Sequence, residues 1–204
     1  MRLYCFPHST NVERVTLALA YKGLEVEPVS VDPADRSAVE EVSGQPLVPV
    51  LDDDGAIVVD STEILRHLEA RHPDPPLYPA AEARRAELDV YIDWFNRVWK
   101  RAPNQMEAEL SEGEPNAARL DALSAAMRAH LDLHEALLAD RDYLFANGFS
   151  AADCVAFPFL KYALGRAGDD DELFHRILDE QQSVEGRPRL EAWVRRVDAR
   201  PRAV

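Results

Sequence analysis

Polar and thiol side chains gather in the first eleven positions of the chain, where a short apolar run gives way to a helical pattern. Ser9, Thr10 and Asn11 stand at the start of that predicted helix, and Cys5 lies in the run before it. A serine hydroxyl is too weak an acid to ionise near neutral pH, so it cannot act as a base. It can donate a hydrogen bond to a negatively charged acceptor. A helix N-terminus adds partial positive charge at the same place. This turn therefore suits the stabilisation of a bound anion.

A second polar pair, Asp60 and Ser61, stands where a predicted hairpin strand meets the start of a helix. The first N–H groups of a helix have no partner within it, and together with the helix dipole they suit a carboxylate ligand. Ser61 is also the predicted N-cap of this helix, a role that the same geometry permits. The pair therefore predicts an anion site and a helix cap at one place.

Several kinds of chemistry have no support in the sequence. Cys5 and Cys154 lie far apart without a CxxC or metal-ligand spacing, so we expect free thiols in a reducing compartment and no bound metal. No glycine-rich phosphate loop or nucleophile–His–Asp signature occurs. With 23 basic and 37 acidic residues the formal net charge is −14, which disfavours nucleic acids and anionic membrane surfaces. The apolar run over residues 154–160 is far shorter than the ~20 residues of a membrane span, so we expect a soluble, cytoplasmic protein.

The apolar pattern changes once along the chain, and the change predicts two domains. Before residue 73 short strand-like runs mix with short helical ones, and after residue 80 the pattern is helical almost throughout. The first part reads as β-α-β-α-β-β-α, with a parallel first half and a closing antiparallel hairpin. Its predicted strands cover residues 2–5, 25–31, 47–51 and 56–59, with a turn at 52–55, and its predicted helices run through 12–19, over 34–42 and onward from Ser61.

Residues 72–79 hold four prolines and cannot continue a helix, so the domain boundary is placed there. The second part has no convincing strand. Its apolar spacing predicts one long helix through residues 88–99, whose buried face includes Val98 and Trp99. Further helices are predicted through 120–138, over 154–164 as the apolar centre, and from 188 to 197. Ser150 and Asp153 form a capping-box pattern before the central helix, with Asp where Glu is usual.

A β-α-β-α-β-β-α unit joined by a proline-rich segment to an all-helical domain resembles the glutathione transferase family over essentially the whole chain. Local matches support the resemblance at residues 4–14, 48–51, 60–61, 148–153 and 188–201. Each match alone is weak, but unrelated folds have no reason to repeat their order and spacing. The resemblance implies an α/β plus all-α fold, with a thioredoxin-like glutathione-binding domain over residues 1–76, a proline-rich linker over 73–81 and an all-helical domain over 82–204.

The resemblance also implies where two parts of glutathione bind. Pro49 is expected to follow a cis peptide bond, so that Val48 offers its N–H and C=O to the cysteinyl backbone like an added strand. Ser61 is expected to hold the α-carboxylate of the γ-glutamyl group through its hydroxyl and N–H. Asp60 is expected to take the α-ammonium of the same group.

The glycyl end departs from the family pattern. Many members carry a polar residue just before the Val-Pro pair, where this chain has Leu47. The glycyl carboxylate is therefore expected to meet Gln45 or Arg36 instead.

Ser9 is the expected catalytic residue, because several classes of the family, tau- and zeta-like members especially, place a serine at this turn. It would donate a hydrogen bond to the glutathione thiolate. Lowering a thiol pKa from about 8.5 to about 6.5 requires roughly 2.7 kcal/mol. A hydrogen bond to a charged acceptor supplies roughly 1.5–3 kcal/mol, and a helix N-terminus up to about 1 more. The alternatives for this contact are Thr10, Asn11, Tyr4, His8 and, in an omega- or glutaredoxin-like enzyme, Cys5.

The second substrate would bind where the first long helix of the helical domain faces the first domain, and the candidates there are Trp94, Arg97, Arg101 and Tyr162. The implied function is a glutathione transferase with glutathione as co-substrate, no permanently bound cofactor, and a small electrophilic, hydrophobic second substrate. The alternatives are a non-catalytic binding protein of the same fold and a glutathione-dependent isomerase or peroxidase. The family also implies a homodimer, in which the basic residues within 84–101 meet the acidic first domain of a second copy.

Overall fold

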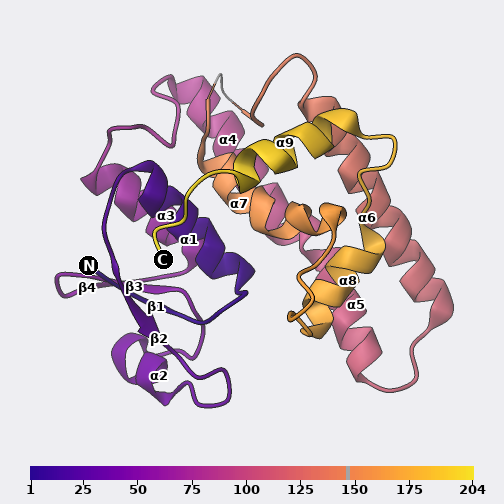
Figure 1. Ribbon diagram of the computed structural model, residues 1–204, viewed down its shortest axis with the longest axis horizontal. Coiled ribbons are helices and arrows are strands. Elements are labelled where there is room, and N and C mark those ends of the chain that lie inside the picture. The colour runs from indigo at the N-terminus through magenta and orange to yellow at the C-terminus, as the bar shows by residue number, and fades with distance from the viewer. Residues whose placement is uncertain (146–147) are drawn as a thin grey trace. The chain divides into compact units, whose positions relative to one another are not determined.

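The computed structural model describes residues 1–145 and 148–204 and divides the chain into two compact units (Figure 1). The first unit comprises Met1–Pro79 together with Arg200–Val204, and the second comprises Ala80–Ala199. The segment Arg200–Val204, which the sequence places in the helical domain, thus belongs with the first unit. Two contacts explain this: the Ala203 N–H donates to the Thr16 carbonyl at 3.1 Å, and the Arg202 guanidinium pairs with Glu13 at 2.8 Å.

A four-stranded sheet frames the first unit, with strand order β2-β1-β3-β4. Its strands are β1 (Arg2–Cys5), β2 (Glu27–Ser30), β3 (Val50–Asp53) and β4 (Ala56–Val59). β1 runs parallel to β2 and antiparallel to β3, and β3 and β4 form a hairpin, so the predicted topology is confirmed. The hairpin turns at Asp54 and Gly55, whose φ angles of 52° and 94° give the left-handed backbone of a tight hairpin turn.

β3 is shifted along the chain from its predicted position. It begins at Val50, and Leu47 lies outside the sheet with 64% of its surface exposed. At the other end Asp52 and Asp53 continue the strand, where the sequence predicts the turn. Their carboxylates have cationic or imidazole partners, Arg2 at 2.6 Å from Asp52 and His67 at 2.8 Å from Asp53, which allows acidic residues within the strand.

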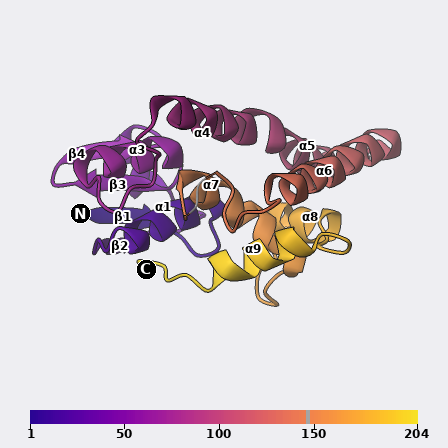
Figure 2. The same cartoon turned by 90° about the horizontal axis from the view of Figure 1, so that it is seen from above.

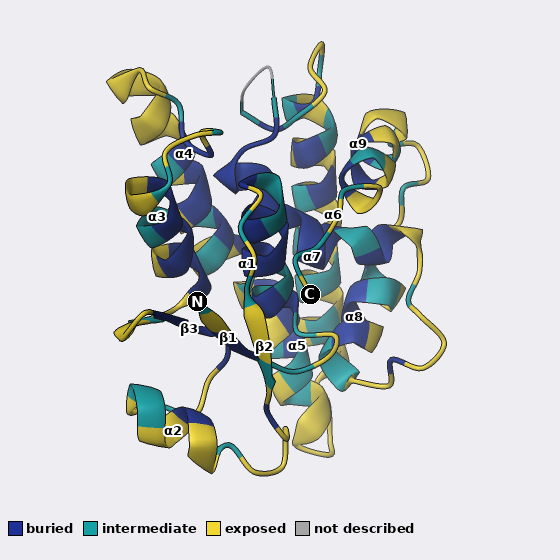
Figure 3. Ribbon diagram, turned by 60° about the vertical axis from the view of Figure 1, so that its left-hand side comes forward, coloured by how far each residue is buried: buried dark blue, intermediate teal, exposed yellow. Residues whose placement is uncertain are grey.

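Three helices cover the sheet: α1 (Thr10–Tyr21) and α3 (Ser61–Arg71) lie on one face and α2 (Ser37–Ser43) on the other (Figures 1 and 3). α1 and α3 also pack against each other. The core between them and the sheet is fully excluded from solvent and includes Leu3 and Leu51 from the strands and Val15, Leu19, Ile64, Leu65 and Leu68 from the helices. The amphipathic spacing in the sequence thus corresponds to this buried layer.

A buried ion pair fixes the proline-rich segment to the first unit. The Lys22 ammonium donates to Glu69 at 2.8 Å and to the carbonyls of His72 and Pro75 at 2.6 and 2.9 Å. The Glu69 carboxylate also accepts from the N–H groups of Leu77 and Tyr78. Each group of the pair therefore has several hydrogen-bond partners, which offsets the cost of burying the two charges.

The second unit is helical over its described residues. Its elements are α4 (Glu82–Trp94), the π-helical segment η1 (Phe95–Trp99), α5 (Arg101–Ser111), α6 (Ala117–Leu137), α7 (Ala151–Leu160), the 3-10 turn η2 (Lys161–Leu164), α8 (Leu173–Gln181) and α9 (Pro188–Asp198). α5 and α6 lie side by side (Figure 2). Every residue of α7 is buried, which confirms this helix as the centre of the core (Figure 3). No helix among the residues described is both long and apolar enough to cross a membrane.

The predicted long helix through residues 88–99 is interrupted by η1. The Lys100 N–H bonds to the Phe95 carbonyl at 3.0 Å, a step of five residues in place of four. This extra residue rotates the following side chains around the axis. Trp99 is therefore 1% exposed and stacks on Phe95 at 4.5 Å, whereas Val98, predicted on the buried face, is 47% exposed.

The capping box at the start of α7 is confirmed and extends further than its motif. Asp153 accepts from the N–H and hydroxyl of Ser150 at 2.9 and 2.8 Å. Its second oxygen accepts from the Leu144 N–H at 3.0 Å and from the Trp193 indole of α9 at 2.8 Å. Burial raises the pKa of Asp153, and these hydrogen bonds oppose that rise. One carboxylate thus joins the start of α7 to α9 and to the segment before α7.

Candidate functional site

The register of the sheet brings the chemistry-bearing segments of the first unit to one end. Tyr4 is paired with Val50, and Val50 with Val59. β1 leaves the sheet beyond Tyr4 toward Ser9, β3 enters it after residues 48–49, and β4 leaves it after Val59 toward Asp60. The ends of β1 and β4 and the start of β3 therefore lie at the same end of the sheet, because antiparallel neighbours run in opposite directions.

Ser9 is the N-cap of α1, and its hydroxyl oxygen accepts from the Val12 N–H at 3.4 Å. This contact uses a lone pair and leaves the hydroxyl proton to be donated. Within the described residues no other hydrogen bond engages the Ser9 side chain. Capping and donation to an anion are therefore compatible.

The alternatives to Ser9 lie in different surroundings. Thr10 and Tyr4 are both 6% exposed. His8 is exposed and has a left-handed φ of 62°. Asn11 is half-buried and follows Thr10 in the first turn of α1. Burial raises the pKa of the Cys5 thiol, which disfavours the thiolate at neutral pH.

Val48 and Pro49 precede β3 and are joined by a cis peptide bond, as expected. Across residues 1–145 and 148–204, no hydrogen bond engages the Val48 N–H or C=O. Because unpaired main-chain groups beside a sheet are a template for an added extended peptide, this segment can hold a peptide-like ligand.

The N-cap of α3 is Asp60, which corrects the prediction that Ser61 occupies this position. The Asp60 Oδ1 accepts from the N–H groups of Thr62 and Glu63 at 2.7 and 3.2 Å, and no hydrogen bond within the described ranges reaches Oδ2. The Asp60 backbone has φ 68° and ψ 127°. Such a conformation costs on the order of 1–3 kcal/mol in a residue other than glycine and is concentrated at functional sites.

Because Asp60 caps the helix, the polar groups of Ser61 are not used for capping. Its N–H is the first of α3 and has no acceptor in the part of the chain that is described. Its hydroxyl oxygen accepts from the Arg14 guanidinium of α1 at 3.3 Å. Arg14 is 1% exposed and was not singled out from the sequence. An arginine within 12–20, a stretch in which six of the nine residues are apolar, is the signal that identifies it.

The two candidates for the glycyl end differ in how many hydrogen-bond donors remain for a ligand. The Gln45 amide bonds within its own turn: it accepts from the Leu47 N–H at 2.7 Å and donates to the Leu47 carbonyl at 2.9 Å. Arg36 is half-buried, lies over the Phe6 ring at 5.2 Å, and donates to the carbonyls of Pro33 and Pro46. A guanidinium has five N–H groups, so Arg36 retains donors for an anion.

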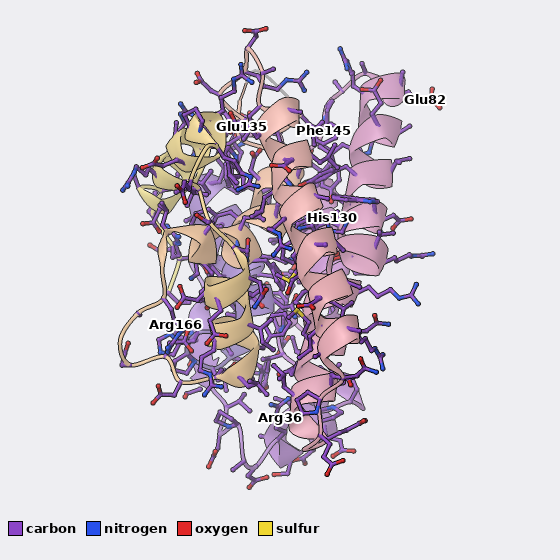
Figure 4. All side chains as sticks on the ribbon, turned by 90° about the vertical axis from the view of Figure 1, so that its right-hand side faces the viewer. Arg36, Glu82, His130, Glu135, Phe145 and Arg166 are labelled. Carbon is purple, nitrogen blue, oxygen red and sulfur yellow. The ribbon has the colours of Figure 1, made fainter. Side chains whose placement is uncertain are left out.

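The acceptor-site candidates occupy separate places in the helical unit. Trp94 is half-buried on α4 and lies edge-on to His130 of α6 at 5.2 Å, and Figure 4 shows His130 on the side of α6 that faces α4. Arg97 and Arg101 are exposed. Tyr162 is 3% exposed and donates to the Asp170 carboxylate at 3.2 Å, within the core of this unit. No cluster of His, Cys, Asp or Glu suited to a metal occurs among the residues described.

Models of known protein domains match a segment in each half of the chain. The model of the glutathione S-transferase N-terminal domain matches residues 3–76, and that of the C-terminal domain matches residues 117–196. "FtsZ-localized protein A" of Caulobacter vibrioides is 31% identical over 167 residues, which cover 76% of this chain and 73% of that protein.

Two solved structures have the same fold over nearly all of the chain. The beta-etherase LigF of Sphingobium sp. has a TM-score of 0.77 at 26% identity, covering 98% of this chain and 95% of that one. A glutathione S-transferase of Methylobacterium radiotolerans, in complex with glutathione sulfonate, has a TM-score of 0.76 at 27% identity, covering 98% and 91%. With the thioredoxin-like sheet, the helical second unit and both domain models in agreement, this chain belongs to the glutathione S-transferase family.

Proposed function

We propose that this protein is a glutathione transferase in which Ser9 stabilises the glutathione thiolate. One observation carries the proposal: the unused polar groups at the end of the sheet correspond to the parts of a γ-glutamyl-cysteinyl peptide. The Ser9 hydroxyl proton suits the thiolate, the Val48 main chain suits the cysteinyl backbone, and the two donors of Ser61 suit the γ-glutamyl carboxylate. The Asp60 Oδ2 suits the neighbouring ammonium.

The reaction follows from holding the thiolate near an electrophile. The thiol loses its proton to solvent, Ser9 donates to the resulting sulfur anion, and the helix N-terminus of α1 adds partial positive charge. The sulfur then forms a bond to an electrophilic carbon while the bond from that carbon to its leaving group breaks, and the leaving group departs with the electron pair. Proximity of the two bound substrates supplies the remaining acceleration.

The ends of glutathione are assigned to different residues. Asp60 and Ser61 hold the γ-glutamyl end. Arg36 meets the glycyl carboxylate more readily than Gln45, because the Gln45 amide is already bonded within its own turn. Trp94, Arg97 and Arg101 of the helical unit remain the candidates for the second substrate, whereas Tyr162 is buried and bonded to Asp170.

The test combines binding with turnover. Calorimetric titration with glutathione is followed by conjugation of a model aryl halide by the parent protein and by Ser9→Gly and Ser9→Ala. Glycine retains most of the N-cap preference, so Ser9→Gly removes the hydroxyl with little loss of helix stability. We expect turnover to fall about tenfold or more in both variants, a barrier increase of about 1.4 kcal/mol or more, while the Kd for glutathione stays within about twofold.

Ser111→Ala is the matched control, because this exposed hydroxyl bonds only locally to the Glu107 carbonyl among the described contacts. Unchanged turnover in the Ser9 variants contradicts the assignment and moves the contact to Thr10 or Asn11.

A second candidate is a non-catalytic binding protein of the same fold, since the relative FtsZ-localized protein A is named for where it localises and not for a reaction. The similarity to the beta-etherase LigF favours adding ethers to the electrophile panel. Glutathione binding without turnover of aryl halides, ethers or peroxides would support the non-catalytic role.

A homodimer is the proposed assembly. α4 and η1 carry exposed apolar side chains, Val90 at 69% and Val98 at 47%, beside the exposed Arg97. Covering this surface with a second copy removes apolar area from water. Light scattering should give a mass about twice 22.9 kDa, and Val90→Asp should shift it toward a single chain. A single-chain mass for the parent protein at low and high salt would contradict the dimer.

A further inference from the structure

Arg14 is an unusual residue for its position in α1. It is 1% exposed and lies among the largest fully buried side chains, and the others of these that belong to the first unit are leucines and one isoleucine. Burying a guanidinium is costly, and hydrogen bonds are needed to offset that cost. One of these bonds is known: Arg14 Nη1 donates to the Ser61 hydroxyl oxygen at 3.3 Å, which joins α1 to the first residue of α3.

The direction of this hydrogen bond is fixed by chemistry. A guanidinium has only donors, so the Ser61 oxygen must be the acceptor. A serine hydroxyl has a single proton, and with its oxygen accepting from Arg14 that proton points to another acceptor. The nearest carboxylate in sequence, Asp60, directs its Oδ1 to the N–H groups of Thr62 and Glu63. The described residues provide no acceptor for the Ser61 proton or for the Ser61 N–H.

We propose that Arg14 is a positioning residue that orients Ser61 as a two-donor clamp and makes this corner of the site selective for a carboxylate. The clamp consists of the Ser61 N–H and O–H, and the Arg14 charge behind it adds to the helix dipole of α3. Two parallel donors match the two oxygens of a carboxylate and cannot satisfy an ammonium. The inference rests on the proposed function, in which this carboxylate is that of the γ-glutamyl group.

A merely structural Arg14 would join α1 to α3 without affecting which ligand is chosen. The two roles separate when the ligand is varied together with the residue. The probes are glutathione and an analogue in which a 4-aminobutyryl group replaces the γ-glutamyl group. This analogue lacks the α-carboxylate and keeps the amine. Dissociation constants for both thiols are measured by calorimetry, and KM and kcat by conjugation of an aryl halide.

The parent protein should bind glutathione at least tenfold more tightly than the analogue that lacks the carboxylate. Arg14→Met should reduce this ratio to about threefold or less, mainly through KM, with kcat changed less. Arg14→Lys keeps a donor-only cation and should retain most of the ratio. Arg71→Met, on an exposed arginine at the other end of α3, should leave the ratio unchanged.

The outcomes are distinct. A ratio in Arg14→Met equal to that of the parent overturns the inference while the proposed function stands. If Arg14→Met does not fold, Arg14→Gln replaces it, and a parental ratio there has the same meaning. Failure of the parent protein to bind either thiol overturns the proposed function and the inference with it.

Discussion

Replacing Asp153 by alanine should strongly destabilise the helical unit. The carboxylate is fully buried and accepts hydrogen bonds from Ser150, Leu144 and Trp193. Removing it leaves these donors without a partner in a site that water does not reach.

The magnitude follows from the separate contacts. Loss of the α7 cap costs about 1 kcal/mol, and a buried donor left unpaired costs about 1–3 kcal/mol, which applies to the Leu144 N–H and the Trp193 indole. Removing a buried carboxylate also returns the cost of its desolvation, the same cause that raises the pKa of Asp153. We therefore expect a net loss of about 4 kcal/mol, near the upper end for single substitutions. At about 2–4 °C per kcal/mol, Tm should fall by roughly 8–16 °C.

The assay is thermal and urea unfolding followed by circular dichroism. Asp153→Asn retains one acceptor oxygen and should lose about half as much stability, and Ser150→Ala about 1 kcal/mol. Asp121→Asn, at an exposed position on α6, is the matched control. A Tm for Asp153→Ala within about 2 °C of the parent would contradict this prediction, because it would mean that these buried donors find other partners at no cost.

Further predictions concern buried ionisable groups and the glycyl end. Burial lowers the pKa of His134 to about 4 from its ordinary value of 6.5. Between these two pH values the unfolded chain binds a proton at His134 and the folded chain does not. The free energy of unfolding should therefore fall by about 3 kcal/mol as pH drops from 6.5 to 4. Urea titrations across that range should show a shallower fall in His134→Gln, and an identical pH profile would contradict the assignment. Lys22→Met should cost about 3–5 kcal/mol, because it leaves the buried Glu69 carboxylate without its cation, and limited proteolysis within residues 72–78 should accelerate; cleavage at the parental rate would contradict this. Arg36→Ala should raise KM for glutathione more than Gln45→Ala does, and the reverse order in steady-state kinetics would contradict the glycyl assignment.

Much of the fold was predictable because it rests on periodic patterns. Strands alternate or run apolar, helices repeat at three and four residues, and the prolines of residues 72–79 interrupt both. What the pattern could not predict are local shifts of phase. Leu47 is apolar yet 64% exposed, because β3 begins only at Val50. The extra residue of η1 turns Val98 outward, and nothing in the spacing of apolar residues signals a π-helical step.

The segments that form the candidate site could be named from the sequence, but their hydrogen bonds could not. Asp60 and Ser61 are both good N-cap residues, and only the structure decides that Asp60 occupies the position. That decision frees Ser61, whose partner Arg14 lies 47 residues earlier on another helix. A contact at such separation leaves no periodic trace in one sequence. The sequence likewise offered no reason to prefer Gln45 or Arg36 for the glycyl carboxylate. In the structure the Gln45 amide is hydrogen-bonded to Leu47 within its own turn.

Stabilisation of the glutathione thiolate by Ser9 is tested most directly by the thiol pKa in the complex. It is read from the pH dependence of kcat/KM for aryl halide conjugation at saturating glutathione, in the parent protein and in Ser9→Gly. If Ser9 stabilises the thiolate, the apparent pKa should lie about two units below the ~8.5 of a free thiol in the parent and rise by at least about one unit in the variant. The same apparent pKa in both proteins would contradict it.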